Sequence, residues 1–344
     1  MPEVISTGPG DRAVQGGGAL SRLARSLGRT LRRFSARFPT YAADAVADPR
    51  WLVMFVFARM LVARRLYVWF VRSTRESREE PAAPTVFADV DEAAVLGDLK
   101  REGLHRGLRL PDGLVGEIRA FALATPCYAG TTRDVSFLPE HHEEAELSCG
   151  RPILVGHYLD RVSDCPAIGA LSRDPGLQRI AAGYLGRPPV PVATRLWWSF
   201  PSTPASEADL HQASQERLHF DLDDWGQLKF FFYLTDVDEG AGPHVYLRGS
   251  HAVRRLAHQF SPFVGLSTET VLRSYGRENL TVLTGPAGTG IVEDPFGFHT
   301  GTLARERRRL ILELSFGLTG VLGRRRHGEM VSGFSLRPRR APAG

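Results

Sequence analysis

Hydrophobic positions divide the chain into a helical first part and a β-rich second part. Between residues 20 and 38, apolar side chains recur at steps of three and four, and arginines fall on the opposite side of the same helical pattern. This spacing predicts an amphipathic helix, which Pro39 ends. Its apolar edge consists of Leu20, Leu23, Leu27, Leu31, Phe34 and Phe38, and its polar side carries Arg22, Arg25, Arg29, Arg32, Arg33 and Arg37.

The next apolar segment, residues 51–71, is interrupted by Arg59, Arg64 and Arg65, and its longest uncharged run is residues 51–58. A membrane-spanning helix needs about eighteen or more apolar residues without charges, so the pattern excludes one here. Three interpretations remain open for residues 20–72. They could lie on an anionic membrane surface, pack on the rest of the protein, or contact a second subunit in a homo-oligomer.

Charged and proline-containing residues 73–88 form a connector, and a new periodicity starts at Asp91. It predicts two helices separated by a turn at Pro111 and Gly113. The apolar positions of these helices are Val95, Leu96 and Leu99, followed by Leu114, Ile118 and Phe121.

From Ile153 onward the apolar runs become short, contain β-branched and aromatic residues, and alternate with turn residues. A helix is predicted for Pro175–Leu185. Strands are predicted for Leu228–Val237, Thr281–Leu283, Thr289–Val292 and Arg309–Phe316. The pattern therefore predicts three parts, namely a helical extension (1–80), a mainly β catalytic domain with flanking helices (81–325), and a basic tail (326–344).

Composition and charge narrow the class of protein. With 344 residues and 43% hydrophobic content, the chain can bury one substantial core and carry an appendage. Its net charge of +5 comes from residues 1–80, which hold fourteen Arg, no Lys and seven acids and contribute +7, so that the remaining 264 residues sum to −2. Because no nucleic-acid motif accompanies this charge, nucleic acid is not an expected partner.

The cysteines and the N-terminal residues bear on the compartment. Cys127, Cys149 and Cys165 are too few and too scattered for a disulfide framework, which favours reduced structural thiols. Residues 1–18 are Gly-rich and lack the apolar core of a signal peptide. We therefore expect a cytoplasmic protein. Residues 20–72 leave open that it contacts the membrane surface peripherally.

The candidate chemistry begins in LHFDLDDWGQLKFFFYLTDVDEGAGPHVYLRGSH, residues 218–251. His219 and Asp221 are two residues apart, so in an extended chain their side chains leave the same face. A third ligand is available in His299, which stands in DPFGFHTG after the turn GPAGTG. Two histidines and one carboxylate leave three adjacent positions of an octahedron open, which iron(II) needs in order to bind a chelating co-substrate and then dioxygen.

The run RERRRLILELSF, residues 305–316, offers a cation ten residues after His299, at the start of a predicted strand. A guanidinium there can grip the distal carboxylate of 2-oxoglutarate through two hydrogen bonds, and Arg309 is the first candidate. Arg308 remains the rival, because strand parity alone does not say which face looks inward. Lys229 is either an inward contact for 2-oxoglutarate or substrate, or an outward, solvated side chain.

Other polar residues near the motif have simpler explanations. His244 and His251 stand at strand turns and are expected to hydrogen-bond to backbone carbonyls rather than to bind metal. Asp223 and Asp224 are expected at the rim of a loop, where they can contact a cationic substrate.

The motifs together resemble the phytanoyl-CoA dioxygenase family over residues 90–320, most closely over 218–316. The likeness rests on His219-Phe-Asp221, on LKFFFYLTDVDEGAGPHVYLRGSH, and on FHTG followed by RRL. It implies a double-stranded β-helix (a jelly roll, cupin-like), Fe(II), 2-oxoglutarate and O2 as cofactor and co-substrates, and hydroxylation of a small molecule such as a metabolite, natural product or lipid-like compound. It also implies His219, Asp221 and His299 as iron ligands and Arg309 as the 2-oxoglutarate anchor.

Two alternative functions are kept beside this one. A jelly roll can serve as a non-catalytic metal-binding or sensing module, of which a missing ligand would be the sign, and no ligand is missing. A zinc hydrolase would need a general base near the metal and would leave Arg309 without a role. Related halogenating enzymes lack the carboxylate ligand, so Asp221 favours oxygen transfer.

Overall fold

The computed structural model describes residues 48–73, 83–203, 218–261 and 265–321, together with Ala42, Ala45 and Val46. The predicted helix at 20–38 and the predicted tail at 326–344 lie outside the described residues. The α-helices are α2 (Pro49–Phe57), α3 (Leu61–Ser73), α4 (Glu92–Glu102), α5 (Asp112–Ala124), α6 (His142–Cys149), α7 (Pro166–Ser172), α8 (Pro175–Leu185), α10 (Leu256–Gln259) and α11 (Thr268–Tyr275). The strands are β1 (Leu104–Arg109), β2 (Cys127–Ala129), β3 (Ser136–Phe137), β4 (Val155–His157), β5 (Val190–Ser199), β6 (Gln227–Tyr233), β7 (His244–Leu247), β8 (Leu280–Leu283), β9 (Thr289–Glu293), β10 (His299–Gly301) and β11 (Arg309–Gly317).

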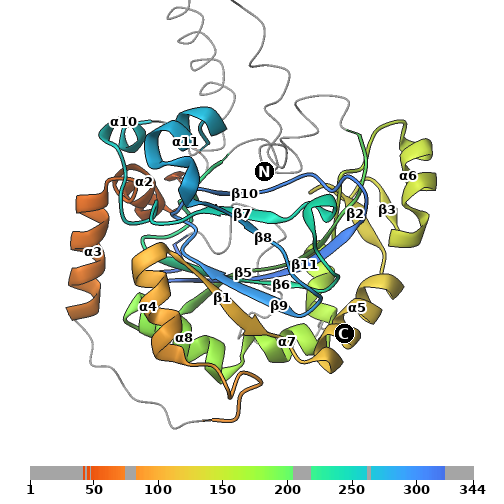
Figure 1. Ribbon diagram of the computed structural model, residues 1–344, viewed down its shortest axis with the longest axis horizontal. Helices are drawn as coiled ribbons and strands as arrows, with labels where there is room; N and C mark the ends of the chain where they lie inside the picture. Colours follow the sequence, from red (N-terminus) through yellow and green to blue (C-terminus); the bar gives the residue numbers. More distant parts are fainter. Residues whose placement is uncertain are drawn as a thin grey trace, which may run out of the picture.

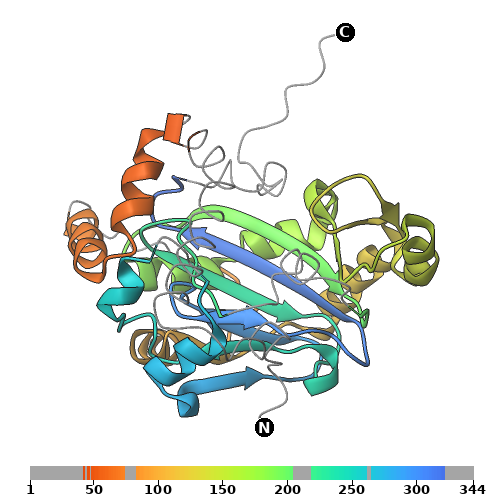
Figure 2. The same cartoon turned by 90° about the horizontal axis from the view of Figure 1, so that it is seen from above.

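Two antiparallel sheets face each other (Figure 1). The larger sheet has the strand order β1-β9-β6-β11-β5-β4-β2-β3, and the smaller sheet has the order β10-β7-β8. A further backbone bridge pairs His219 with His299 and thereby adds the segment around residue 219 beside β10. Figure 2 shows the long strands of the larger sheet crossing the molecule side by side. The fold is therefore mostly antiparallel sheet with helices around it.

Helices α4, α7 and α8 lie against the outer face of the larger sheet (Figure 1). Strand β11 shows how the sequence sorts its two faces, because all nine of its residues are buried. Leu310, Leu312 and Leu314 belong to the large apolar core beneath these helices, whereas Arg309 and Glu313 alternate with them and face the other sheet. The inner face of this strand thus carries charged side chains into the interior.

Helix α8 illustrates why local sequence fixes the boundaries of an element. Asp174 caps its N-terminus by accepting hydrogen bonds from the backbone N–H groups of Gly176 and Leu177, and Pro175 occupies the first helical position. Gly186 ends the helix in the left-handed conformation. The observed bounds are those predicted from the sequence.

The predicted strands at 281–283, 289–292 and 309–316 are confirmed as β8, β9 and β11, with one-residue shifts at their ends, whereas the strand predicted at 228–237 is confirmed as β6 but ends four residues earlier, at Tyr233. The two helices predicted after Asp91 are confirmed as α4 and α5. Between them the structure has strand β1, which the sequence pattern did not predict. The strand is bulged between Arg106 and Leu108, at Gly107, which breaks the alternation of its two faces, so that Leu104 and Leu108 belong to different apolar clusters.

The apolar segment 51–71 forms two helices, α2 and α3, rather than one. Both pack on the β part of the molecule. The ring of Tyr67 stacks on Trp225 with centroids 4.1 Å apart, and the Arg64 guanidinium lies over Phe296. Among the residues that the structure describes, no helix combines the length and the apolar character that crossing a bilayer would require.

Candidate metal centre

Two chain segments bring three potential metal ligands together. His219 and His299 exchange backbone hydrogen bonds of 3.0 and 2.8 Å, so the two residues stand opposite each other on neighbouring strand segments. The next residue but one, Asp221, is fixed by its own backbone N–H, which donates to the carbonyl of Pro295 over 2.8 Å. The backbone pairing thus places all three side chains on one side of this small sheet.

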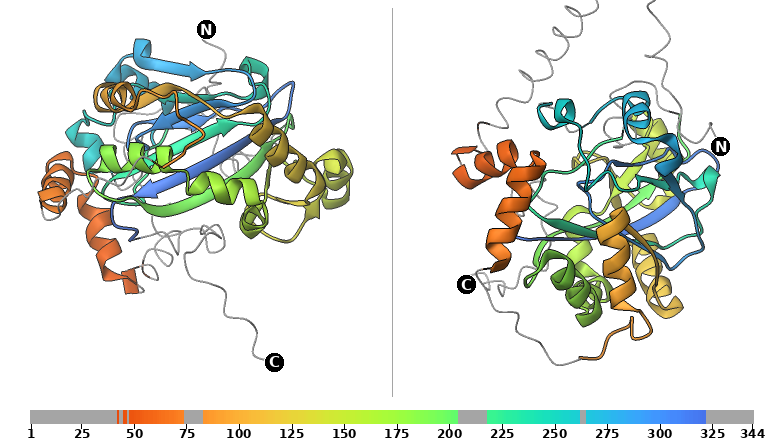
Figure 3. Two further views of the ribbon diagram at one scale, coloured as in Figure 1. Left: turned by 90° about the horizontal axis from the view of Figure 1, so that it is seen from below. Right: turned by 60° about the vertical axis from the view of Figure 1, so that its left-hand side comes forward.

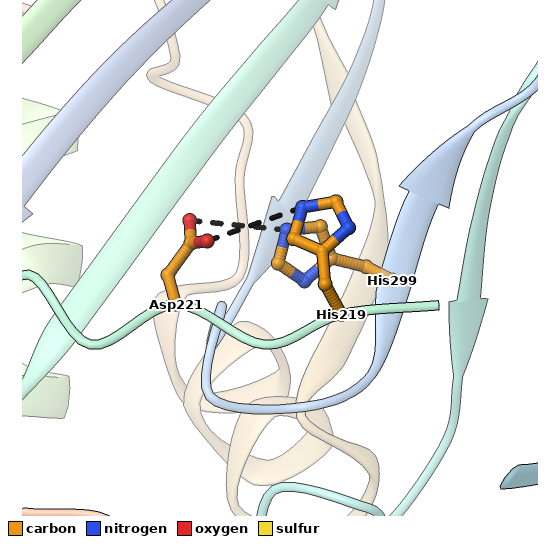
Figure 4. A group of neighbouring side chains, drawn as sticks. All are labelled: His219, Asp221 and His299. Carbon is orange, nitrogen blue, oxygen red and sulfur yellow. Dashed lines mark ion pairs between the residues drawn. The ribbon is translucent and has the colours of Figure 1, made fainter. Parts of the chain in front are cut away.

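Figure 4 shows the three side chains pointing toward one another. One donor atom from each residue lies within 4.8 Å of the other two. Nε2 of His219 is 4.0 Å from Oδ1 of Asp221, and Nε2 of His299 is 3.8 Å from Oδ2 of the same carboxylate. The side chain of His299 is 5% exposed while that of His219 is 26% exposed, so the site is closed on one side and open on the other.

The surroundings of His299 keep its ring neutral and fix which of its nitrogens carries the proton. Its Nδ1 lies 3.0 Å from the carbonyl oxygen of Gly297, which can only accept a hydrogen bond. Nδ1 therefore carries the proton and the lone pair is left on Nε2, the atom that faces Asp221. Burial lowers the pKa of His299 to about 4, which keeps the ring neutral at physiological pH.

Lys229 in β6 sets the charge of the third ligand. Its buried ammonium is 2.6 Å from Oδ2 of Asp221 and 3.2 Å from Oε1 of Glu313. Burial opposes the ionisation of Asp221, but the charge of Lys229 and its hydrogen bond to the carboxylate act in the opposite direction, and the pKa of Asp221 lies far below its usual value. Burial likewise opposes the charge on Lys229, and the two carboxylates together raise its pKa. Lys229 thus points inward, and its observed partners are carboxylates of the chain.

The charged network continues along the inner face of the larger sheet. Arg195 in β5 donates through Nη1 to both carboxylate oxygens of Glu313, at 2.9 and 3.1 Å. Glu313 therefore forms ion pairs with two cations, Lys229 and Arg195. Lys229 forms a second ion pair with Asp221. Such a network fixes the carboxylates in place because Lys229 and Glu313 are buried, Asp221 and Arg195 are largely so, and each has a partner of opposite charge.

The structure distinguishes Arg309 from Arg308, the two arginines that the sequence offered as candidate anchors for an anion. Arg309 is buried and donates to the carbonyl of Gly242 and, over 3.0 Å, to Oγ of Ser199. Its Nε is buried and has no hydrogen-bond partner among the described residues. Arg308 is exposed, lies over the ring of Trp198, and donates to the carbonyl of Pro139. Arg309 is therefore the one that faces the interior between the two sheets.

A buried His–Glu pair stands behind His299. Nε2 of His244 is 2.8 Å from Glu293, and the other oxygen of Glu293 is 3.9 Å from Nδ1 of His299. Burial lowers the pKa of His244 to about 3 and raises the pKa of Glu293 to about 7. From its position at a strand turn, His244 was expected to bond to a backbone carbonyl. The structure shows instead that its ring bonds to a carboxyl group.

The expected place of Asp224 at a loop rim is wrong. Its carboxylate is buried and accepts hydrogen bonds from the backbone N–H groups of Thr319 and Gly320 and from the Thr319 hydroxyl. These bonds tie the start of β6 to the end of β11. Asp223 is also buried. His251 is buried as well and packs against Gly103.

Sequence reasoning did not single out Arg195, Glu293 or Glu313 as parts of the site. Glu313 shares the face of Arg309 at a step of four, so strand parity was a usable signal for it. Arg195 and Glu293 come close to the centre only through strand pairing, since Arg195 pairs with Glu313 and Lys229 pairs with Glu293. No local pattern in the sequence reports such pairings.

Comparisons with known proteins give structural similarities only. No protein-family model matches the sequence, and no curated protein matches it.

Several solved structures are similar in part. AviO1 from Streptomyces viridochromogenes Tue57 is 16% identical over 68% of this chain and 96% of its own, with a TM-score of 0.43. The epimerase SnoN, in complex with Fe3+, alpha ketoglutarate and nogalamycin RO, is 15% identical over 65% and 82%, with a TM-score of 0.46. HygX from Streptomyces hygroscopicus, with nickel and 2-oxoglutarate bound, is 16% identical over 66% and 87%, with a TM-score of 0.45. At these low scores the similarities carry no weight for function.

Proposed function

We propose that this protein is an iron(II)- and 2-oxoglutarate-dependent oxygenase that hydroxylates a small molecule. The observation that carries the proposal is the convergence of His219, Asp221 and His299, whose donor atoms lie within 4.8 Å of one another. Two imidazoles and one carboxylate are the ligand set that non-haem iron(II) enzymes use. The resemblance of the motifs to the phytanoyl-CoA dioxygenase family supports the same assignment.

The strand order supports a jelly roll for the proposed catalytic domain. From β5 onward, with the segment at His219 counted, the chain passes back and forth between the sheets, with only β7 and β8 consecutive in one sheet, so that β5, β6, β9 and β11 lie together in the larger sheet. The segment at His219 lies with β10, β7 and β8 on the other side. Such alternation is typical of a double-stranded β-helix, which encloses a site between its sheets. The division into parts at residues 80 and 325 remains a prediction.

The chain's residues fit the proposed iron and its co-substrate. His219, Asp221 and His299 would hold the ion, and His299 presents a lone pair because its other nitrogen is bonded to Gly297. Bound iron(II) would supply the redox chemistry through which dioxygen oxidises 2-oxoglutarate to succinate and carbon dioxide and also oxidises the substrate.

The remaining parts of the proposed mechanism belong to the protein. Arg309 would grip the distal carboxylate of 2-oxoglutarate, and its unpartnered, buried Nε leaves a donor for that purpose. Lys229 holds Asp221 ionised and in place. The apolar side chains between the sheets, among them Phe231, Tyr233 and Ile311, exclude water from the region around the reacting groups.

Succinate release is the test of this function. The protein, loaded with iron(II) without oxygen, is mixed with 2-oxoglutarate, oxygen and candidate small molecules, and succinate is measured. We expect succinate from the wild type, a loss of about 100-fold or more in His299→Ala, and no change in His141→Ala, a control at an exposed histidine. Lack of turnover under all conditions would favour a non-catalytic binding module, and metal-dependent hydrolysis without succinate would favour a zinc enzyme.

A further inference from the structure

Exposed apolar side chains are concentrated on one part of the surface. Eleven of the fifteen large hydrophobic residues that are exposed in the described part of the chain lie on α2, on α3, or between residues 253 and 260. On the two helices their exposed fractions run from 40% to 70%. We name this set the α2–α3–α10 surface: Leu52, Val53, Val56, Phe57, Val62, Leu66, Trp69, Phe70, Val253, Leu256 and Phe260.

Direct contacts join residues 59–65, in and just before α3, to residues 252–261, which include α10. The backbone N–H of Leu61 donates to Oε1 of Gln259 over 2.9 Å, and Arg65 donates to the carbonyl of Ala252 over 2.7 Å. Arg59 also donates to the carbonyl of Ser261. Figure 1 shows α3 at one edge of the molecule with α2 and α10 close together at one end of it, and in the two views of Figure 3 the same helices lie outside the sheets. The surface is therefore continuous.

Helices α2 and α3 are apolar on two sides. Trp51 and Met54 of α2 are completely buried against the rest of the protein, which accounts for one side of that helix. The opposite side of a helix that packs on a domain normally carries polar residues. Here it carries Leu52, Val56 and Phe57, and α3 continues the surface at steps of three and four. Contiguous exposed apolar side chains of this kind mark an interaction surface.

Charge indicates the nature of the partner. Residues 49–73 contain five arginines and no acidic residue, and three of the arginines, Arg50, Arg65 and Arg72, are exposed, of which Arg50 pairs with Asp48. A second copy docked through the same surface in a symmetric dimer would bring the exposed Arg65 and Arg72 near their own equivalents. Residues 20–38 of the chain carry six further arginines and no acid, so they too would add like charge to the surface. A negatively charged partner removes this repulsion.

We propose that the α2–α3–α10 surface docks the protein on an anionic lipid bilayer. Leu66, Phe70 and Phe57 would enter the boundary between headgroups and acyl chains, and Trp69 suits the same depth because its ring is apolar with one polar edge. Arg65 lies at the margin of the surface, where a guanidinium contacts lipid phosphates. The proposal is independent of the metal centre and goes beyond the proposed oxygenase function.

Vesicle sedimentation tests this proposal with the full-length protein. Wild type and the double variant Trp69→Ser/Phe70→Ser are mixed with vesicles of phosphatidylcholine alone or of phosphatidylcholine with phosphatidylglycerol at 3:1. The control is Leu147→Ser/Val190→Ser, which removes two exposed apolar residues elsewhere. We expect wild type and control to bind the anionic vesicles, and the Trp69 variant to bind about 10-fold or more weakly. Neutral vesicles should bind all three proteins weakly.

Three results would overturn the proposal. Equal binding of wild type and the Trp69 variant would transfer the contact to another segment, such as residues 20–38. No binding of wild type to anionic vesicles would exclude lipid as the partner. A concentration-dependent dimer that the Trp69 variant abolishes, seen by light scattering without lipid, would make the surface a contact between copies. Because the substituted side chains are exposed, circular dichroism and melting temperature should match between variants, which separates lost docking from lost folding.

Discussion

At the scale of single residues, the sequence contains only two lysines, and their environments are opposite. Lys229 is buried between Asp221 and Glu313, whereas Lys100 on α4 is exposed. A buried ammonium between two carboxylates compensates charges that would otherwise be isolated in a poorly polarisable interior. The pair offers a direct comparison of a buried and an exposed cation in one protein.

Replacing Lys229 with Met is expected to reduce the free energy of unfolding by about 3–5 kcal/mol, because Asp221 and Glu313 are left buried with one cation fewer. Lys100→Met is the control and should change it by less than about 0.5 kcal/mol. Urea unfolding of the metal-free protein measures both. Adding Glu313→Gln to Lys229→Met should restore part of the loss, and a Lys229→Met protein as stable as wild type would contradict the observed pairing.

Arg309 and Arg308 are neighbours in sequence that face opposite sides of β11. Under the proposed function, Arg309→Met should raise the KM for 2-oxoglutarate by roughly 100-fold, because a two-point contact to a carboxylate is lost. Arg308→Met should leave that KM within about 2-fold, since Arg308 lies outside over Trp198. Succinate release at varied 2-oxoglutarate concentration gives both constants. Equal KM values in the two variants would remove Arg309 from the anchor role.

His157 in β4 predicts a dependence of stability on pH. Burial, assisted by the charge of Arg195, lowers the pKa of His157 to about 4 from a usual value near 6.5. Between these values the unfolded chain binds the proton and the folded one does not, so stability falls as pH falls from 6.5 to 4. At pH 5 this residue should account for a loss of about 2 kcal/mol relative to pH 7.

Denaturant unfolding at pH 7 and pH 5 checks this expectation. His157→Gln cannot take up the proton, so the difference between the two pH values should be about 2 kcal/mol smaller in the variant than in wild type. His141→Ala, at an exposed histidine, serves as the control and should keep the wild-type difference. An unchanged pH difference in His157→Gln would show that this ring is not held neutral by its surroundings.

At the scale of elements, close backbone approach explains one glycine in a strand. A Cβ added to Gly290 of β9 would lie 2.7 Å from Cβ of Leu108 and 2.9 Å from its carbonyl oxygen in β1. A Cβ added to Gly116 in helix α5 would have no neighbouring atom within 4 Å. The two glycines therefore differ in whether a side chain has room.

Gly290→Ala is expected to destabilise the protein by about 1–3 kcal/mol, because the pairing of β1 with β9 must open to admit the methyl group. Gly116→Ala should stabilise it by about 0.5–1 kcal/mol, since alanine favours a helix interior and meets no obstacle there. Thermal or urea unfolding distinguishes the two signs. A stabilising Gly290→Ala would mean that β1 does not lie as closely on β9 as described.

Elements with a strong local signal were predictable from the sequence, and those shaped by distant contacts were not. Strand β11 has apolar residues at alternate positions and helix α8 has its own caps, so both were found. Strand β1 was missed because its bulge at Gly107 breaks the alternation of positions by which a strand is recognised. The break between α2 and α3 contains neither Gly nor Pro, and it coincides with the contact of Arg59 to Ser261, which lies about 200 positions further along the chain.

At the scale of the whole molecule, the candidate site also has parts that the sequence predicts locally and parts that depend on distant contacts. His219, Asp221 and His299 were identified because ligand type and spacing are local properties of two short motifs. The support around them was not, since Glu293, Arg195 and Glu313 reach it through pairings between strands far apart in the sequence. The packing of α3 onto the loop before His299, through Arg64 and Phe296, likewise had no local signal.

The central claim is that His219, Asp221 and His299 bind one divalent metal ion, and anaerobic calorimetric titration with iron(II) tests it most directly. Wild type and the control His141→Ala should each bind one ion per chain with the same affinity. His299→Ala should bind at least about 100-fold more weakly, because one of three protein ligands is gone. Equal iron affinity in His299→Ala and wild type, or no binding by wild type, would contradict the account.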